Sequence, residues 1–249
     1  MLENIDIKEI NAIAKEAGKA ILEVYKKDFD VNYKEDSSPL TKADLKANEI
    51  ICSNLQKLYP NIPIISEENK KTSYEERKNW EYLWLIDPLD GTKEFVKKNG
   101  EFTVNIALIH KDTPVLGVVY APVLDLIYYA KKGEGAYKNS QRLPLCQERK
   151  TYKIVTSKSH LNKETKEFVD SVKTDKPKES VSIGSSLKLC LIAEGSADIY
   201  PRLGSTMEWD TAAAHAIALE SGKKVLRFED KKPVVYNKEN LLNPWFIAY

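Results

Sequence analysis

Apolar residues recur at helical spacing through the first sixty residues. The pattern over residues 6–27 predicts an amphipathic helix that begins after Asp6 as its N-cap. Residues 33–40 form a polar break, and residues 41–60 repeat the helical pattern until Pro60 ends it. The predicted inward faces comprise Ile7, Ile10, Ile13, Ala14, Ala17, Ile21 and Val24 in the first helix, and Ala43, Ala47, Ile50, Ile51, Leu55 and Leu58 in the second.

The pattern then changes to short apolar or alternating runs that are separated by turn residues. Such runs are typical of strands that follow one another in a sheet, and we expect them to be antiparallel. The last of them leads into a predicted hairpin over residues 134–145. The predicted strands are residues 62–66, 82–87, 103–110, 114–122 and 125–133.

From about residue 150 the predicted strands and helices alternate. Alternation of this kind is typical of an α/β unit. We therefore expect an N-terminal α+β part over residues 1–145 and a C-terminal α/β part over residues 146–249. The predicted strands are residues 153–157, 180–184, 198–203, 223–228 and 244–249, and the helices are residues 162–173, 185–197 and 209–222.

Composition and charge restrict the class of partner. The 249 residues carry a net charge of +1 without a basic tail, which argues against nucleic-acid polymers and membrane surfaces as partners. The sequence has neither an N-terminal signal-peptide pattern nor an apolar run long enough to span a membrane. Its three cysteines have no CxxC spacing, which indicates packed thiols in a reducing compartment. We expect a cytoplasmic protein with a small-molecule partner.

The stretch LWLIDPLDGTKEF, residues 83–95, places two carboxylates at the end of an apolar strand. Asp87 closes the apolar run and Asp90 follows three residues later. The simplest alternative is a plain turn, because Asp-Pro-x-Asp-Gly is favourable turn chemistry by itself. A catalytic interpretation is equally open at this point, because strand ends carry the chemistry in many α/β proteins.

Other acidic residues also occupy the edges of predicted elements. Glu67 and Glu68 end the strand of IPIISEEN, and Asp210 opens the Ala-rich helix. Asp44 stands at the third position after Thr41. Taken alone, Asp210 is compatible with an N-cap and Asp44 with a capping box. Together with the strand-end carboxylates, these placements favour one shared site with oxygen ligands.

Carboxylates that share a site repel one another and raise each other's pKa, and a hard divalent cation relieves this repulsion. Oxygen ligands without histidine or cysteine favour Mg²⁺ or Mn²⁺ over Zn²⁺. Gly91 allows a phosphate to approach the backbone, and Thr92 supplies a hydroxyl beside it. If residues 91–95 open a helix, their free N–H groups face that anion. The pattern indicates metal-assisted hydrolysis of a phosphate monoester.

The segments SEEN, WLIDPLDGTKEF and EWDTAAAHAI resemble the three metal-site motifs of the inositol monophosphatase superfamily of Mg²⁺-dependent, lithium-sensitive phosphatases. PLTKAD, FTVNIALI, GVVYAP, SIGSSLKLCLIAEGSADIYPRLG and LNPWF are similar to one branch, the bacterial 3′(2′),5′-bisphosphate nucleotidases of the CysQ type. The resemblance implies a five-layer αβαβα sandwich of the inositol monophosphatase and fructose-1,6-bisphosphatase type. One departure is Ala214, where many relatives carry glycine.

The resemblance also implies the metal site. Asp87 would bridge two Mg²⁺ ions, Asp90 and Asp210 would hold one of them, and Glu67 with the Leu89 carbonyl would hold the other. A third, weaker ion near Glu67 and replacement by Mn²⁺ are both compatible with this donor set.

The mechanism that we expect is direct attack of a metal-activated water on phosphorus. Thr92 paired with Asp44 would orient the water and take its proton, and Glu67 counts with them as catalytic. The N–H groups of Gly91 and Thr92 would hold the phosphate that is cleaved, and Asp210 would also contact the substrate.

The substrate implied by the resemblance is 3′-phosphoadenosine 5′-phosphate, which is cleaved to AMP and phosphate. Lys188 and Arg202 are the candidates for its second phosphate, with Ser186 and His160 near the nucleotide. The plain alternative for each is a solvated surface residue. Two other functions stay open, namely an inositol or sugar phosphatase on the same scaffold and a non-catalytic module that binds a phospholigand or a cation.

Overall fold

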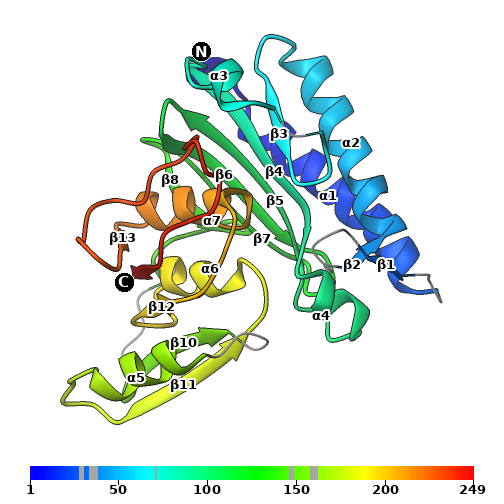
Figure 1. Cartoon of the computed structure of the whole chain (residues 1–249). Helices are drawn as coiled ribbons and strands as arrows, with labels where there is room; N and C mark the ends of the chain where they lie inside the picture. The colour runs from blue at the N-terminus through cyan, green and yellow to red at the C-terminus, as the bar shows by residue number, and fades with distance from the viewer. Residues whose placement is uncertain (28–30, 34–38, 71, 146–148, 158–161) are drawn as a thin grey trace.

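The computed structural model describes residues 1–27, 31–33, 39–70, 72–145, 149–157 and 162–249. Its elements stack in layers that begin with the helix pair α1 and α2 (Figure 1). A large sheet follows, then the helices α6 and α7, then a group of short strands with α5. This order agrees with the five-layer sandwich that the family resemblance implies. No helix within the described ranges is long and apolar enough to cross a membrane.

The helix pair α1 (Ile7–Tyr25) and α2 (Lys42–Leu58) covers one face of the large sheet. The Asp6 side chain caps α1 by accepting the Lys8 N–H at 2.8 Å, as predicted. Most of the predicted inward residues are buried, but Leu58 is exposed because it ends α2. The described ends of the predicted polar break belong to a short ladder, in which β1 (Val31–Tyr33) pairs with β2 (Pro39–Thr41). The short 3₁₀ helix Leu2–Asn4 precedes α1.

The large sheet has seven strands in the order β3-β4-β5-β6-β7-β8-β9. All neighbouring pairs are antiparallel except β3 and β4, which are parallel. The prediction of antiparallel strands was therefore wrong for this pair. The chain crosses back through α3 (Tyr74–Arg77) between the two strands, so both run in the same direction and end at the same edge. The strands are β3 (Ile64–Ser66), β4 (Tyr82–Asp90), β5 (Thr103–His110), β6 (Thr113–Ala121), β7 (Leu126–Lys131), β8 (Gly135–Lys138) and β9 (Gln141–Arg142).

Strand β4 continues beyond the position where the sequence pattern ends it. It runs to Asp90, and its pairing with β5 shifts register between Asp87 and Asp90. The predicted turn is therefore an irregular strand end. Gly91 then adopts φ 92° as the N-cap of the short helix α4 (Thr92–Val96), which confirms that residues 91–95 open a helix.

The C-terminal part contributes two small sheets. Strand β10 (Tyr152–Ser157) pairs in parallel with β11 (Lys178–Ile183), and a parallel bridge joins Ile154 to Ile199. The other sheet has the order β12-β14-β13 and is antiparallel. The boundary between residues 145 and 146 stays a prediction. The remaining elements are β12 (Tyr200–Arg202), β13 (Val225–Arg227), β14 (Phe246–Ala248), α5 (Lys163–Ser171), α6 (Leu187–Glu194) and α7 (Glu208–Glu220).

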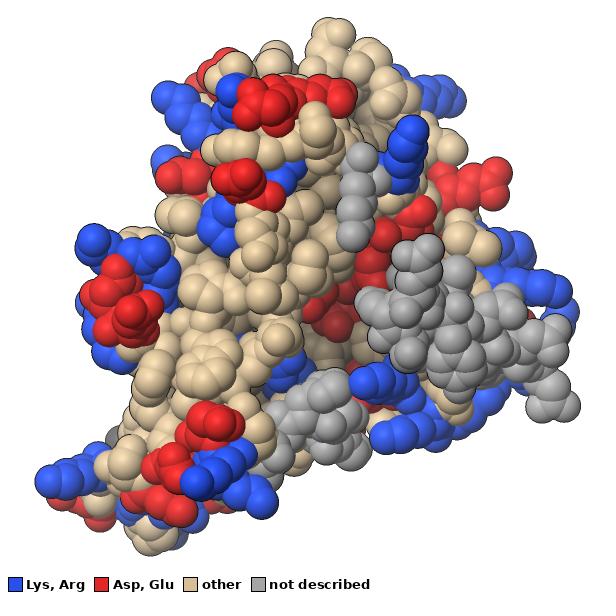
Figure 2. All heavy atoms as spheres, in the orientation of Figure 1, with Lys and Arg blue, Asp and Glu red and all other residues tan. Residues whose placement is uncertain are grey.

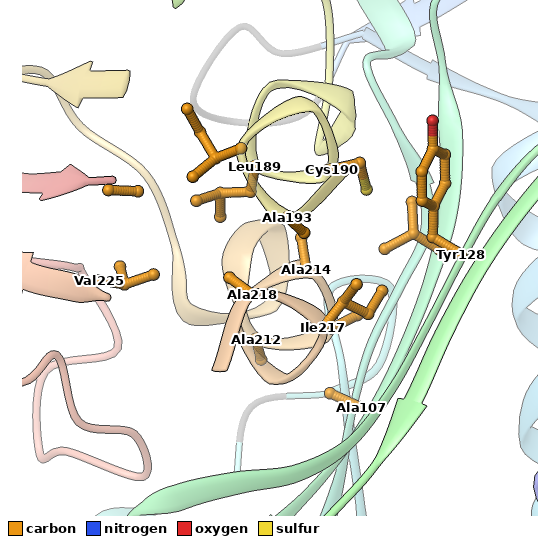
Figure 3. Packing of buried hydrophobic residues seen from close by; sticks show 14 of the residues in the cluster. Ala107, Tyr128, Leu189, Cys190, Ala193, Ala212, Ala214, Ile217, Ala218 and Val225 are labelled. Carbon is orange, nitrogen blue, oxygen red and sulfur yellow. The ribbon is translucent and has the colours of Figure 1, made fainter. Parts of the chain in front are cut away.

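Helix α7 packs against the large sheet and against α6 through small side chains (Figure 3). Gly117 on β6 permits the closest approach, because a Cβ there would lie 2.1 Å from the Ala213 carbonyl oxygen. Ala214 is fully buried in the same core, beside Ala193 of α6. This packing fixes the N-terminus of α7 over the edge of the sheet where β3 and β4 end.

Two cysteines lie in described segments. Cys190 is buried in this core and Cys52 is half-buried on α2, and both are free thiols, as predicted. Cys146 lies outside the described residues.

Candidate active site

A cavity of about 260 Å³ lies where β4, α4, α6 and α7 meet. Figure 2 shows acidic and basic side chains within a hollow near the middle of one face of the molecule. The cavity lining contains most of the residues that the sequence predicts for the site. It comprises Glu67, Asp87, Leu89, Asp90, Gly91, Thr92, Lys93, Glu94, Ser157, Gly184, Ser185, Ser186, Lys188, Leu189, Tyr200, Arg202, Ser205, Thr206, Asp210 and Thr211.

Carboxylate oxygens of Glu67, Asp87 and Asp210 lie within 4.8 Å of one another. Their closeness follows from the fold. The parallel pairing of β3 and β4 brings Glu67 beside the Asp87 end of β4, and the Glu67 N–H donates to the Ile86 carbonyl at 3.1 Å. Helix α7 brings Asp210 in from the other side. An all-oxygen donor set of this kind fits a hard divalent cation.

Asp90 is held by neighbouring polar groups. Its Oδ2 accepts the Ser186 backbone N–H at 2.6 Å, the Ser186 hydroxyl at 2.8 Å and the Asn105 amide at 3.3 Å. The same hydroxyl also lies 2.6 Å from the carbonyl oxygen of Asp210. Ser186 and Asn105 therefore connect the Asp90 strand end to the first turn of α7.

The carboxyl groups of the cavity perturb one another. Burial raises the pKa of Asp87 well above its ordinary value, and the charges of Glu67, Asp90 and Asp210 raise it further. Burial and then the Asp90 charge raise the pKa of Asp210 to about 8, although the Met207 N–H lowers it. Burial also raises the pKa of Asp90, against the lowering effect of the Lys188 ammonium. Binding of a divalent cation would relieve this repulsion.

Thr92 and Asp44 meet beside this cluster. The Thr92 hydroxyl lies 3.4 Å from Asp44 Oδ1 and 3.3 Å from the Leu89 carbonyl oxygen. Asp44 Oδ2 accepts both the N–H and the hydroxyl of Thr41, at 2.8 and 2.7 Å. The capping-box alternative is therefore confirmed, and it does not exclude the catalytic one. Because the cap uses Oδ2, Oδ1 faces Thr92.

Gly91 has a packing requirement as well as its conformational one. With φ 92°, it lies so close to residues 101–102 that a Cβ would be 3.3 Å from the Glu101 carbonyl oxygen. A side chain at this position would meet backbone and would also stand on the cavity wall. Glycine therefore keeps the backbone N–H groups at the start of α4 accessible.

Lys188 and Arg202 both line the cavity. The Lys188 side chain is only 9% exposed, so the alternative of a solvated surface residue is wrong for it. Its Nζ donates to the Ser185 carbonyl at 2.7 Å, and burial lowers its pKa to about 8 even though Asp90 lies near. Arg202, at the end of β12, donates to the carbonyl of Ser205 at 2.6 Å, and Ser205 lies in the loop that precedes α7. Lys188 and Arg202 thus give the cavity a cationic wall close to its carboxylates.

The large aromatic residues near the site have different surroundings. Tyr200 lines the cavity, whereas Trp209 lies in the core among the apolar residues around α7. His160 lies outside the described residues. The sequence analysis missed Asn105, whose amide donates to Ser186 at 2.7 Å as well as to Asp90. The sequence feature that could have indicated Asn105 is an amide side chain within the apolar run TVNIALIH.

Comparison with known proteins gives a consistent result. The pattern described as the inositol monophosphatase family matches residues 2–245. The chain is 45% identical over 252 residues to the 3′(2′),5′-bisphosphate nucleotidase CysQ of Salmonella typhimurium, covering 96% of this chain and 98% of that protein.

Two solved structures show the same fold. The crystal structure of CysQ from Bacteroides thetaiotaomicron superposes with a TM-score of 0.86 at 46% identity, covering 95% of this chain and 93% of that one. The suhB protein of Bartonella henselae superposes with a TM-score of 0.80 at 25% identity, with coverage of 97% and 92%. The similarity therefore extends over almost the whole chain.

Proposed function

The chain belongs to the inositol monophosphatase family, and from this membership we propose that it hydrolyses the 3′-phosphate of 3′-phosphoadenosine 5′-phosphate to AMP and phosphate. Relatives at about 45% identity carry the name of this activity. The observation that carries the proposal is the presence of an acidic cluster together with Lys188 and Arg202 in one cavity. A bisphosphate needs both surfaces, because one of its phosphates is cleaved and the other is only held.

The carboxylates are suited to two Mg²⁺ ions, with Mn²⁺ as a substitute. The residues that would hold them are Glu67, Asp87, Asp90 and Asp210, with the Leu89 carbonyl. A third, weaker ion would bind near Glu67. When bound, such ions lower the pKa of a water molecule and neutralise charge on the phosphoryl oxygens.

The residues of the chain supply orientation and proton transfer. The Thr92 hydroxyl would accept the proton of the attacking water and pass its own to Asp44 Oδ1, which lies 3.4 Å away. The N–H groups of Gly91 and Thr92 would hold the phosphate that is cleaved. Glu67 would help to position the water, and Asp210 would also contact the substrate.

The second phosphate would bind to the cationic wall. Arg202 can contact it bidentately and Lys188 can contact it as a buried point charge. The Ser186 hydroxyl donates to Asp90, so Ser186 would stand beside the nucleotide as a link between the two parts of the site. His160 stays a proposed nucleotide contact. Tyr200 lines the same cavity and lies close to Arg202.

The test is a comparison of kcat/KM for 3′-phosphoadenosine 5′-phosphate, inositol 1-phosphate and fructose 1,6-bisphosphate in Mg²⁺. We expect the nucleotide to be preferred by at least about tenfold, the factor that one charge-assisted hydrogen bond supplies. A preference for inositol 1-phosphate or the sugar bisphosphate would favour the alternative phosphatase function. Failure to release phosphate from any of them would favour a non-catalytic binding module. A parallel reaction with a chelator controls for phosphatases that need no divalent cation.

A further inference from the structure

The motif LNPWF, residues 242–246, lies outside the cavity lining, but the chain just before and within it contacts the start of α7. Residues 241–243 run antiparallel to residues 206–208. The Asn243 N–H donates to the Thr206 carbonyl at 2.8 Å. The pairing is completed by the Glu208 N–H, which donates to the Leu241 carbonyl at 2.9 Å, and by a bridge between Met207 and Leu242.

The Asn243 side chain inserts below this turn. It is only 4% exposed, and its amide nitrogen is surrounded by oxygen acceptors. The distances from Nδ2 are 2.7 Å to the Met207 carbonyl, 2.9 Å to the Thr211 hydroxyl and 3.3 Å to the Thr206 hydroxyl. An aspartate or an aliphatic side chain of similar size could not replace these contacts, because neither offers two N–H donors.

The contacts of Asn243 lead directly to a carboxylate of the acidic cluster. The peptide between Thr206 and Met207 accepts the Asn243 N–H at its carbonyl. Its own N–H, from Met207, donates to Asp210 Oδ2 at 2.9 Å. The next carbonyl, that of Met207, accepts the Asn243 amide. Asn243 therefore contacts the peptide that holds Asp210 through its main chain, and it contacts the carbonyl that follows this peptide through its side chain.

We propose that Asn243 is a positioning residue for the cation site. By fixing the Met207 peptide, it holds the Asp210 carboxylate in the orientation that groups it with Glu67 and Asp87. This inference rests on the proposed function, because it assumes that Asp210 is a ligand. Partners of this kind, which orient a ligand without touching the metal, typically change metal affinity by about tenfold to a hundredfold.

A matched control lies on the same C-terminal segment. Asn237 is 9% exposed, and its side chain exchanges hydrogen bonds with Arg77, at 2.8 Å to Nη1 and 3.0 Å to the carbonyl. It also has φ 57°, which alanine adopts less readily than asparagine. Asn237→Ala thus removes buried hydrogen bonds and destabilises the fold, but its side chain makes no hydrogen bond to Met207 or Asp210.

The experiment measures Mn²⁺ binding to the metal-free, full-length protein by isothermal titration calorimetry, without substrate. We expect Asn243→Ala to raise the Kd for Mn²⁺ by about tenfold. We expect Asn237→Ala to lower the Tm by at least as much as Asn243→Ala does. Its Kd for Mn²⁺ should nevertheless equal that of the wild type. If Asn243→Ala does not fold, Asn243→Ser, which keeps a smaller donor, is measured against the same control.

An unchanged Kd in the Asn243 variant would overturn the inference. An equal rise in both variants would also overturn it, because general loosening of the segment would then explain the effect. Substrate identity does not enter this measurement, so a negative substrate panel leaves it standing. If the wild-type protein bound no Mn²⁺, the proposed cation site would fail, and the inference would fail with it.

Discussion

Asp90 combines a structural and a proposed catalytic role in one side chain. One of its oxygens accepts hydrogen bonds from Ser186 and Asn105, which an amide oxygen at the same position can also accept. If Asp90 holds a cation, however, an amide cannot replace its negative charge. The two roles can therefore be separated by changing the charge and keeping the shape.

Asp90→Asn should lower kcat by at least about a hundredfold, which corresponds to roughly 2.7 kcal/mol of transition-state stabilisation. The Tm of the metal-free variant should not fall, because burial already disfavours the charged form of Asp90. Steady-state kinetics and thermal melts check both statements. Asp112→Asn, on the exposed turn at the far end of β5, controls for the loss of one charge. Near-normal turnover of Asp90→Asn at low Mg²⁺ would contradict the two-metal assignment.

Asp210 predicts how pH affects the stability of the metal-free protein. Its pKa in the folded state is about 8, against 3.8 ordinarily, so the folded protein binds more protons than the unfolded chain between these values. Stability should consequently decrease as pH rises through this window. Asp210 alone should cost about 2 kcal/mol between pH 6.5 and 8.5, and Lys188, whose pKa burial lowers to about 8, should return roughly 1 kcal/mol of this. We therefore expect the Tm in chelator to fall over this range by roughly 2–4 °C, the effect of the remaining difference of about 1 kcal/mol in a protein of this size.

The matching variant is Asp210→Asn, which removes this titration. Its Tm in chelator should depend less on pH than that of the wild type over the same range. A wild-type Tm that rises from pH 6.5 to 8.5, or an equal slope in both proteins, would mean that Asp210 is not the group responsible.

Arg202 tests the assignment of the second phosphate. A charge-assisted hydrogen bond contributes roughly 1.5–3 kcal/mol, so Arg202→Ala should lower kcat/KM for the bisphosphate nucleotide by about tenfold to a hundredfold. The effect on inositol 1-phosphate, which has no second phosphate, should be small. Arg227→Ala removes the same charge from an ion pair with Asp230 that lies away from the cavity lining. Equal losses on both substrates would show that Arg202 supports the fold or the acidic cluster instead.

At the scale of elements, the site depends on how closely α7 approaches the large sheet. Gly117 on β6 lies directly beneath the helix, and a Cβ there would be 2.1 Å from a backbone oxygen, that of Ala213. A backbone atom of a packed helix cannot rotate away as a side chain can. The helix must therefore shift if residue 117 gains a side chain, and Asp210 would shift with its first turn.

Gly117→Ala should reduce the free energy of unfolding by about 1–3 kcal/mol or more, the usual effect of overpacking. We also expect a lower kcat through displacement of Asp210. Denaturant unfolding and kinetics on the same preparation measure the two effects. Gly204→Ala is the control for stability, because a Cβ at Gly204 would meet no atom within 4 Å. Wild-type stability in the Gly117 variant would contradict the close packing of α7 on β6.

At the scale of the whole molecule, the acidic cluster combines parts of the chain that are far apart in sequence. Glu67 and Asp87 come from the edge of the large sheet, and Asp210 comes from a helix more than a hundred residues later. The Ser186 hydroxyl joins Asp90 to the Asp210 carbonyl across this junction. Binding of an ion between Asp90 and Asp210 therefore requires that the edge of the large sheet and the start of α7 are correctly assembled.

Lithium provides that test. If it occupies the position between Asp90 and Asp210, LiCl at tens of millimolar should inhibit hydrolysis at fixed Mg²⁺, and KCl at the same concentration should not. The dependence of the initial rate on each salt is the measurement. Full activity in LiCl would count against placing this chain with the lithium-sensitive members of its family.

Local sequence patterns specify most elements and the residues that end them. Periodicity of apolar side chains is a local property, so it predicted α1, α2 and most strands correctly. The placement of Glu67, Asp87, Asp90 and Asp210 at element edges was also visible, because an acidic residue directly after an apolar run interrupts the pattern. The motif resemblance then supplied the family.

How these edges meet depends on long-range packing. The parallel pairing of β3 with β4 depends on the path of the chain between them, which local periodicity does not encode. The burial of Lys188 and the contacts of Asn243 arise from elements that are distant in sequence. In the sequence alone, a lysine and an asparagine at these positions are equally compatible with exposed loops. The sequence thus determined which groups are available, and long-range packing determined their distances and pKa values.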